Sequence, residues 1–277
     1  MKKIGFIDYY LSEWHANNYP AWIRELCKER GLDYEIAYAW GEIEVSLRDG
    51  KTNTEWCAAN GVELCKTMEE VCEKSDVLLI LAPSNPEKHL EYAKTALKYG
   101  KLTYIDKTFT PCYADAKEIF DLADRYGTKC FSTSALRYAS ELDELKGAQQ
   151  VVTTGGGRSA DEYLVHQVEM IVKLLGVDAT AVKTEWQGKQ GIFRIAYGDQ
   201  KSATAIYDAS LPFAVTAELE DGSSKAKNVN SDFFRVLMEK ILNFYETGET
   251  DFCRCETLAV MKIREELLAN GGAWEKI

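Results

Sequence analysis

The sequence predicts an α/β protein with two domains: a doubly wound parallel sheet first, then an α+β domain with a mainly antiparallel sheet. At 277 residues the chain exceeds the usual size of one domain. Short apolar runs alternate with amphipathic stretches as far as about Ser134, which predicts β–α–β units with helices on both faces of a parallel sheet. Beyond Ser134, alternating patterns separated by turn pairs predict an antiparallel sheet. We expect the domains to cover residues 1–134 and 135–277.

The centre of the predicted parallel sheet is Val77–Leu81, which is apolar throughout, as a strand covered on both faces requires. Glycines close several of the helices as C-caps. Ligands of such a sheet bind at the carboxyl ends of its strands. The expected elements are strand Lys3–Ile7, helix Tyr19–Arg30, strand Tyr34–Ala39, helices Glu55–Asn60 and Met68–Lys74, strand Val77–Leu81, helix Pro86–Tyr99, strand Leu102–Ile105, helix Ala114–Tyr126 and strand Thr128–Ser132.

In the C-terminal domain, the turn pairs Gly198-Asp199 and Asp221-Gly222 separate some of the strands, as in antiparallel hairpins. A long apolar helix is expected to end at Gly176. The expected elements are helix Ser140–Lys146, strand Gln149–Thr153, helix Asp161–Leu175, strands Ala181–Trp186, Ile192–Tyr197, Ser202–Tyr207 and Phe213–Leu219, and helices Asp232–Glu246 and Thr257–Ala269.

The composition argues against several kinds of partner. A formal net charge of −11 would repel nucleic acid and anionic membranes. No stretch approaches the length of a membrane span, and the apolar part of the N-terminal MKKIGFID is too short for a signal peptide. We therefore expect a cytoplasmic protein with no nucleic-acid and no membrane partner.

The eight cysteines show no repeated C-x-x-C spacing, and without a secretion signal we expect reduced thiols. The pair Cys253-x-Cys255 has a spacing that can bind a metal or oxidise. Most unpaired cysteines, however, are small apolar fillers of a core. No metal site is predicted.

Three motifs carry chemistry. The first runs from Asp76 to Thr108, DVLLILAPSNPEKHLEYAKTALKYGKLTYIDKT, and the second is YGTKCFSTSALRY at Tyr126–Tyr138. The third is the helix DEYLVHQVEMIVKLLG at Asp161–Gly176. Together they resemble the glucose–fructose oxidoreductase and inositol dehydrogenase (Gfo/Idh/MocA) family of two-domain, nicotinamide-dependent enzymes. The resemblance implies a Rossmann-like nucleotide-binding domain over residues 1–134, a substrate and oligomerisation domain over 135–277, and NAD(H) or NADP(H) as the cofactor.

Three side chains suit the chemistry of such an enzyme. Moving a hydride off a carbinol carbon also requires a group that takes the hydroxyl proton. Lys107 follows a buried strand at the ligand-binding edge, where its ammonium can polarise an oxygen and, when desolvated, relay a proton. His166 is the natural acid–base group at neutral pH. Glu162, one helical turn earlier on the same face, can orient the imidazole or hold a substrate hydroxyl. The resemblance implies these catalytic roles, with Glu162 in place of the family's Asp.

Each of these residues also has a structural interpretation. A lysine at a strand end is commonly a solvated surface residue. A histidine on an apolar helix face is more often a half-buried structural residue than a catalyst. Asp161 competes with Glu162 for the carboxylate role, and Glu169 can simply cover the helix surface.

Other residues are expected near the cofactor. The turn Ala82–Asn85 borders it in the relatives, and the Ser and Asn of this turn can donate hydrogen bonds. His89, in the next helix, is either a ligand contact or a polar residue near a helix start. Trp40 takes the place of the acidic residue that holds the adenosine ribose in dinucleotide folds, with Glu42 as a substitute. No arginine cluster follows, so the pattern does not favour a 2′-phosphate.

The first strand-to-helix turn departs from the family pattern. In the dinucleotide fold, glycines let the backbone approach the diphosphate at a helix N-terminus. Here Asp8, Tyr10 and Glu13 stand near the positions of those glycines. One ionised carboxylate about 4 Å from a phosphate charge costs roughly 4 kcal/mol at an effective dielectric of about 20. That corresponds to about a thousandfold in affinity. We therefore expect atypical cofactor binding.

The same turn is rich in aromatic rings. Tyr9 and Tyr10 can stack on a sugar, a nicotinamide or an adenine, or simply fill the loop. Tyr19 and Trp22 are expected to pack the first helix onto the sheet. The expected cofactor contacts are Asp8, Tyr9, Tyr10, Trp40, Ala82, Pro83, Ser84, Asn85, His89 and Asp106.

Three functions are compatible with the sequence. The first is an NAD(P)-dependent oxidoreductase acting on a CH–OH group of a sugar, a polyol or a related hydroxylated compound. The second is a non-catalytic ligand-binding or partner subunit that has lost dinucleotide binding, with Tyr9 or Tyr10 filling the phosphate position. The third is proton abstraction or elimination from a carbohydrate by Lys107 and His166 without a nucleotide. The resemblance also implies a homo-oligomer formed through the open face of the C-terminal sheet.

Overall fold

The computed structural model describes residues 1–198 and 200–277 and divides the chain into two compact units. Unit 1 comprises Met1–Ser132 and Met238–Asp251, and unit 2 comprises Thr133–Leu237 and Phe252–Ile277. The predicted Gly198-Asp199 turn lies partly outside the described residues, because Asp199 is not among them.

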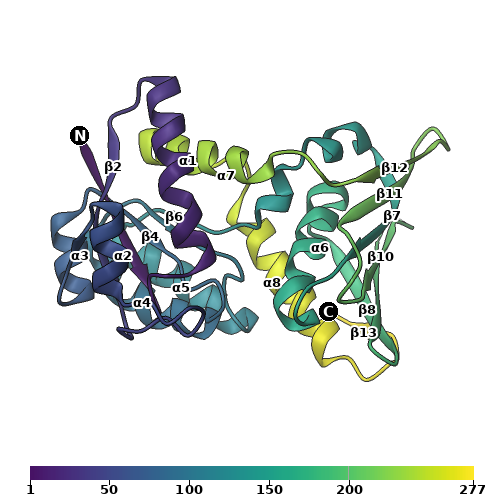
Figure 1. Ribbon diagram of the computed structural model, residues 1–277. Coiled ribbons are helices and arrows are strands. Elements are labelled where there is room, and N and C mark those ends of the chain that lie inside the picture. Colours follow the sequence, from purple (N-terminus) through teal and green to yellow (C-terminus); the bar gives the residue numbers. More distant parts are fainter. Residues whose placement is uncertain (199) are drawn as a thin grey trace. The chain divides into compact units, whose positions relative to one another are not determined.

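Unit 1 is built on a parallel sheet of six strands in the order β3-β2-β1-β4-β5-β6, which confirms the predicted doubly wound domain (Figure 1). β1 pairs on one side with β2 and on the other with β4, so the strand order changes direction there. Doubly wound sheets bind their ligands at this point. The strands are β1 (Lys2–Asp8), β2 (Tyr34–Gly41), β3 (Glu63–Leu64), β4 (Val77–Ile80), β5 (Thr103–Ile105) and β6 (Cys130–Phe131).

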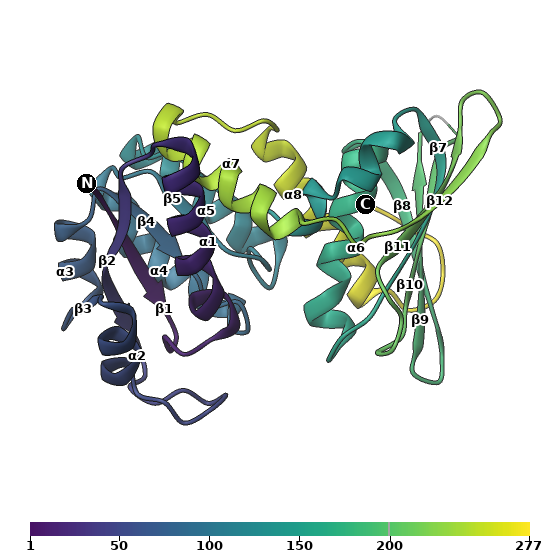
Figure 2. The same cartoon turned by 45° about the horizontal axis from the view of Figure 1, so that its top comes forward.

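Helices cover both faces of this sheet. Figures 1 and 2 show α1 and α7 on one side of it and α3 and α4 on the other. Every residue of β4 is buried, as expected for a strand covered on both faces. The helices are α1 (Trp14–Arg30), α2 (Asn53–Asn60), α3 (Met68–Lys74), α4 (His89–Ala96), α5 (Tyr113–Tyr126) and, from Met238 onward, α7 (Phe233–Thr247), with short 3₁₀ turns at Pro86–Lys88 and Leu97–Tyr99.

Helix α1 begins at Trp14, so the predicted start at Tyr19 is wrong. Glu13 instead caps the helix, because its side chain accepts the backbone N–H of Trp14. The earlier start leaves Pro20 inside the helix and places the helix N-terminus close behind the end of β1.

Unit 2 contains a sheet of seven strands in the order β12-β11-β7-β10-β9-β8-β13. Its pairs are antiparallel except for β7 with β10, which confirms a mainly antiparallel sheet. The sequence did not indicate β12, because its Ser and Lys residues lack an apolar face. The strands are β7 (Ala148–Gly155), β8 (Ala179–Gln187), β9 (Gln190–Tyr197), β10 (Ser202–Tyr207), β11 (Ala214–Leu219), β12 (Ser224–Asn228) and β13 (Glu275–Lys276).

Helices α6 (Ala160–Leu175) and α8 (Arg254–Ala269) pack together and lie on one side of this sheet in both ribbon views (Figures 1 and 2). The residues of β10 alternate between buried and half-buried, as expected for a sheet with one covered face. The predicted helix at Ser140–Lys146 is a 3₁₀ helix over Ser140–Leu145, preceded by another at Ala135–Tyr138.

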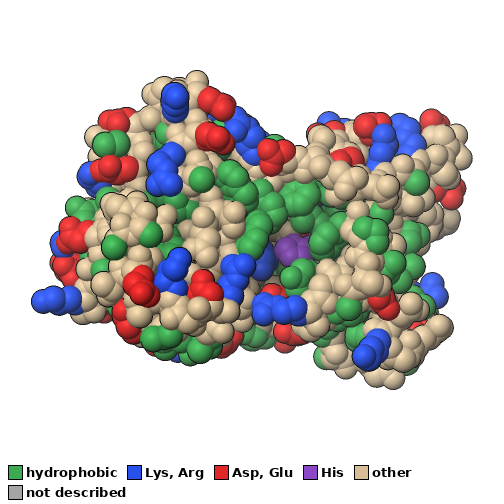
Figure 3. Space-filling model, viewed as in Figure 1, with side chains coloured by type: hydrophobic (Ala, Val, Ile, Leu, Met, Phe, Trp, Pro, Cys, Tyr) green, Lys and Arg blue, Asp and Glu red, His purple; other side chains and the backbone are tan. Residues whose placement is uncertain are grey.

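The surface carries charges of both signs. Figure 3 shows acidic and basic side chains interspersed over the visible face of each unit. Within residues 1–198 and 200–277, no helix combines the length and the apolar character that a membrane-spanning helix requires.

Candidate active site

Lys107 lies two residues beyond the end of β5, at the carboxyl edge of the unit 1 sheet. Its side chain is half-buried, and its Nζ is 3.4 Å from the carbonyl oxygen of Pro83, in the turn that follows β4. Two neighbouring parallel strands thus bring Lys107 and the turn Ala82–Asn85 to the same edge. Ala82 begins that turn with a φ of 53°, a left-handed conformation that is uncommon for alanine.

Asp106 is the centre of a buried cluster that the sequence did not indicate. Its carboxylate bonds to Nδ1 of His15 and accepts a hydrogen bond of 3.2 Å from the Tyr104 hydroxyl. Tyr19 stacks on His15, with ring centroids 5.0 Å apart. Burial alone would raise the pKa of Asp106, but His15 and the nearby Lys107 ammonium outweigh it, so the pKa lies below its ordinary value.

Asp8 ends β1, at the point between β1 and β4 where a doubly wound sheet binds its ligand. Its Oδ1 accepts the backbone N–H of Tyr9 at 2.7 Å and that of Ala82 at 2.9 Å. Its Oδ2 is buried and has no hydrogen-bond partner among the residues that the structure describes. Burial raises the pKa of Asp8 well above its ordinary value, although the two N–H bonds oppose the rise. This carboxyl group therefore favours its neutral form far more than an ordinary aspartate does.

Other groups of the β1–α1 turn also form hydrogen bonds within the chain. Oε1 of Glu13 accepts the N–H of Trp14 at the start of α1, at 2.6 Å, and its Oε2 accepts the Tyr10 hydroxyl at 3.0 Å. The N–H of Leu11 donates to Oδ1 of Asn53 at 2.9 Å. A dinucleotide fold holds its diphosphate with N–H groups of this turn and of this helix terminus. Because side chains of this chain already accept several of them, the turn does not fit a diphosphate in the usual position.

The carboxylate that follows the end of β2 belongs to Glu42. Glu42 accepts hydrogen bonds from Nζ of Lys88 and from the hydroxyl of Tyr92, both at 2.7 Å. Against the effect of burial, these two bonds lower the pKa of Glu42. The ring of Trp40 packs edge-on against Tyr92, and the Lys88 ammonium lies 5.7 Å from the centroid of the Tyr9 ring. Trp40 and Tyr9 thus lie beside a Glu–Lys pair rather than beside an isolated carboxylate.

His89 is fully buried at the start of α4. One ring nitrogen faces the carbonyl oxygen of Phe109 at 2.9 Å, and the other faces that of Leu81. Burial lowers the pKa of His89, although both carbonyl oxygens oppose the shift. In this position the ring ties the turn after β4 to the segment after β5.

In unit 2, His166 lies on the buried side of α6. Its Nδ1 is 2.7 Å from Oγ of Ser134, a residue that the sequence did not single out. Glu162 lies one turn earlier and forms an ion pair with Arg158, at 2.6 and 3.0 Å. Asp161, the competing carboxylate, accepts a hydrogen bond of 2.8 Å from Arg264.

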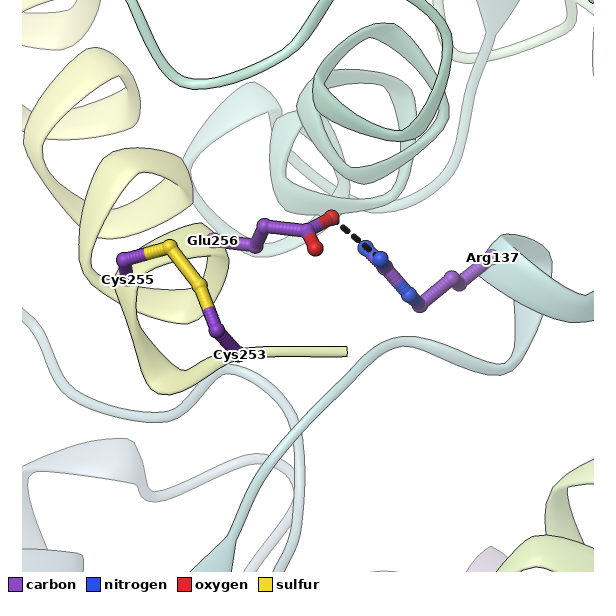
Figure 4. Close-up of a disulfide and its surroundings, with 4 residues drawn as sticks. All are labelled: Arg137, Cys253, Cys255 and Glu256. Atoms are coloured by element: carbon purple, nitrogen blue, oxygen red, sulfur yellow. Dashed lines mark hydrogen bonds and ion pairs between the residues drawn. A yellow bond between two sulfur atoms is a disulfide. The ribbon is translucent and has the colours of Figure 1, made fainter. Parts of the chain in front are cut away.

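A buried ionic network holds α6 to the start of α8. Glu169 is buried, so the interpretation of this residue as part of the helix surface is wrong. Its carboxylate accepts the Thr133 hydroxyl at 2.7 Å and the Arg137 guanidinium at 3.3 Å. Arg137 also binds Glu256 in the first turn of α8, as Figure 4 shows. Burial raises the pKa of Glu169, and Arg137 offsets only part of the rise.

Next to Glu256, Cys253 and Cys255 form a disulfide (Figure 4). The expectation of reduced thiols is therefore wrong for this pair, because the chain brings the two sulfurs together at the start of α8. The expectation of reduced thiols is confirmed for a set of buried cysteines in unit 1. Burial raises the pKa of two of them, Cys57 and Cys72, to about 12. These buried thiols are Cys27, Cys57, Cys65 and Cys72.

The raised pKa of Asp8 predicts how Asp8→Asn changes stability. Between the ordinary pKa, about 4, and the raised folded value, the unfolded chain releases a proton that the folded chain retains. The contribution of Asp8 to the free energy of unfolding therefore falls as pH rises, whereas Asn does not titrate. Urea denaturation at pH 4, 5.5 and 7 should show the wild type losing stability relative to Asp8→Asn with each step. A constant difference across the three pH values would contradict this.

Arg137→Met should destabilise unit 2 by about 3–5 kcal/mol, because it leaves the buried carboxylate of Glu169 without its cation. Adding Glu169→Gln should recover part of the loss. Chemical denaturation measures both. A loss below about 1 kcal/mol for Arg137→Met would mean that the network contributes little.

Comparison with known proteins finds similarity to one family of oxidoreductases. The family profile described as "Oxidoreductase family, NAD-binding Rossmann fold" (Gfo/Idh/MocA) matches residues 39–134. Uncharacterized oxidoreductase YhhX of Escherichia coli is 33% identical over 89 residues, which are 32% of this chain and 26% of the relative. Uncharacterized oxidoreductase C115.03 of Schizosaccharomyces pombe is 24% identical over 205 residues, 74% of this chain and 53% of the relative. The matches thus span between about a quarter and about half of these relatives.

Solved structures share the fold over the whole chain. An oxidoreductase from Bacillus cereus superposes with a TM-score of 0.75 at 13% identity, covering 100% of this chain and 99% of that one. GenD2 from gentamicin A biosynthesis, in complex with NAD, gives 0.78 at 12% identity, with 100% and 97% covered. UDP-N-acetylglucosamine 3-dehydrogenase GnnA from Acidithiobacillus ferrooxidans gives 0.73 at 11% identity, with 96% and 95% covered. In its matched N-terminal segment and in its fold, the chain is similar to the Gfo/Idh/MocA oxidoreductases, whose family profile describes an NAD-binding Rossmann fold.

Proposed function

We propose that the protein is an oxidoreductase that uses NAD(H) or NADP(H) on a CH–OH group of a sugar, a polyol or a related hydroxylated compound. The observation that carries the proposal is the position of Lys107, just beyond β5 and with its Nζ 3.4 Å from the carbonyl oxygen of Pro83. A half-buried ammonium at this edge of a Rossmann sheet suits a group that handles a substrate oxygen. A fold neighbour described as a UDP-N-acetylglucosamine 3-dehydrogenase supports a carbohydrate-like substrate.

The proposed roles concern the substrate hydroxyl. Lys107, beside the buried Asp106, polarises the hydroxyl oxygen. His166 takes the hydroxyl proton, and the Ser134 hydroxyl fixes the orientation of its imidazole. Glu162, held by Arg158, binds a further hydroxyl of the substrate. In this proposal residues 135–277 form the substrate and oligomerisation domain.

The first test is cofactor binding by the purified protein. Millimolar NAD(H) or NADP(H) should raise the melting temperature, because a ligand that binds only the folded state stabilises it. No shift with either dinucleotide, together with no turnover of polyols or sugars, would leave the non-catalytic ligand-binding or partner subunit as the better description.

Lys107→Met and His166→Asn should each lower kcat/KM by at least about 100-fold, the usual scale for removing a positioned acid–base group. The matched control is Lys101→Met. Lys101 lies before the same strand, at the opposite edge of the sheet, where its ammonium binds main-chain carbonyls. Steady-state kinetics on the substrate found by screening measure the effect. Equal losses in Lys101→Met and Lys107→Met would contradict the assignment.

We also propose a homo-oligomer formed through the face of the unit 2 sheet opposite α6 and α8. Val152 of β7 is 40% exposed although it lies in a mid-sheet strand. Val152→Lys should dissociate the oligomer in sedimentation velocity, because a buried interface does not accept an unpaired ammonium. Leu47→Lys, at an apolar residue of unit 1 that is 74% exposed, is the matched control. A monomeric wild type, or a Val152→Lys protein of unchanged size, would contradict the proposal. A cytoplasmic location and the absence of nucleic-acid partners stay predictions from the sequence.

A further inference from the structure

The β1–α1 turn of unit 1 holds two carboxyl groups where a dinucleotide fold holds a diphosphate. Asp8 accepts two main-chain N–H groups, one from the turn after β1 and one from the turn after β4. Glu13 accepts the first N–H of α1. Both side chains are buried, at 1% and 8% exposure. Their oxygens thus lie at main-chain donors of the kind that bind phosphate oxygens at a helix N-terminus.

The segment after β2 fixes this arrangement. The Asn53 amide accepts the N–H of Leu11 and donates to the carbonyl oxygens of Gly41 and Ile43. It packs so closely that a Cβ on Gly41 would lie 2.6 Å from its amide nitrogen, so only glycine leaves room for it. The Ser12 hydroxyl binds Asp49 at 2.8 Å. The turn is therefore held in place by a second segment of the chain.

We propose that Asp8 and Glu13 take the place of the diphosphate in this turn and thereby set the affinity of the chain for dinucleotides. Phosphate binding is obstructed because the side-chain oxygens already occupy the N–H groups, and not only because the side chains carry charge. A neutral side chain that kept the same oxygen in place would obstruct the phosphate as well. This inference rests on the proposed function for its ligand, and it names the residues that make the binding atypical.

The test uses isothermal titration with ADP-ribose, which carries the diphosphate, and with adenosine, which lacks it. Asp8→Gly releases the N–H groups of Tyr9 and Ala82 and should tighten ADP-ribose binding at least tenfold. Asp8→Asn keeps an acceptor oxygen in place and should stay within about threefold of the wild type. Adenosine should bind equally to all variants.

The matched control is Asp76→Gly. Asp76 also accepts a main-chain N–H, that of Lys3, but at the amino ends of the strands. Asp76→Gly should leave the affinity for ADP-ribose unchanged. Glu13→Gly is tolerated at an N-cap and removes the acceptor oxygen, so it should also tighten ADP-ribose binding. It tests the proposal if Asp8→Gly does not fold.

Two results would overturn the proposal. One is an affinity for ADP-ribose that does not rise in Asp8→Gly or, if that variant is unfolded, in Glu13→Gly. The other is an equal rise in Asp8→Asn, which would make charge alone the obstacle. This experiment measures binding and involves no substrate or turnover. The inference can therefore hold even if the protein is not an oxidoreductase, and it can fail even if the protein is one.

Discussion

The hydrogen bonds from two backbone N–H groups to the Asp8 carboxyl group determine how the candidate site is built. They join the end of β1 to the turn after β4, where the strand order of the sheet changes direction. In a dinucleotide fold these two strand ends flank the ligand. Here a buried side chain links them, and its second oxygen has no partner within the described part of the chain.

The bonds of Asp8 distinguish two effects that the sequence alone does not separate, namely electrostatic repulsion of a phosphate and occupancy of the N–H groups that would bind it. From the sequence, carboxylates in the phosphate turn imply electrostatic repulsion. Burial raises the pKa of Asp8, which weakens the repulsion, but the same burial leaves its oxygen bonded to the N–H groups. Obstruction therefore remains even where charge does not. Lys107, by contrast, lies next to Asp106, a carboxyl group whose pKa is below its ordinary value.

Local sequence patterns predicted most of the fold. The apolar run at β4, the glycine C-caps at Gly31 and Gly127, and the alternation of strands in unit 2 depend on residues close together in the chain, and the structure has all of them. The site was harder to predict, because its contacts join distant residues. His15 and Asp106 are separated by 91 positions, and Leu11 and Asn53 by 42. No spacing rule links such pairs.

Two further features were missed for related reasons. Glu169 follows the polar pattern of an exposed helix position, and its burial is explained by the distant Arg137 and Thr133, which bind its carboxylate. The link between Cys253 and Cys255 depends on how the chain enters α8. Departures from a family pattern, such as the missing glycines of the first turn, were the best signal in the sequence. They pointed to the β1–α1 turn, although the hydrogen-bond partners of its side chains could not be predicted from the sequence.

Carbon-13 and amide NMR of the wild-type protein during a pH titration is the most direct test of this account. If Asp8 accepts the N–H groups of Tyr9 and Ala82, its carboxyl carbon and both amide resonances should titrate together, with one shared midpoint above the ordinary range for aspartate. A carboxyl carbon that titrates at an ordinary or lower pH, or amides that do not follow it, would contradict the account.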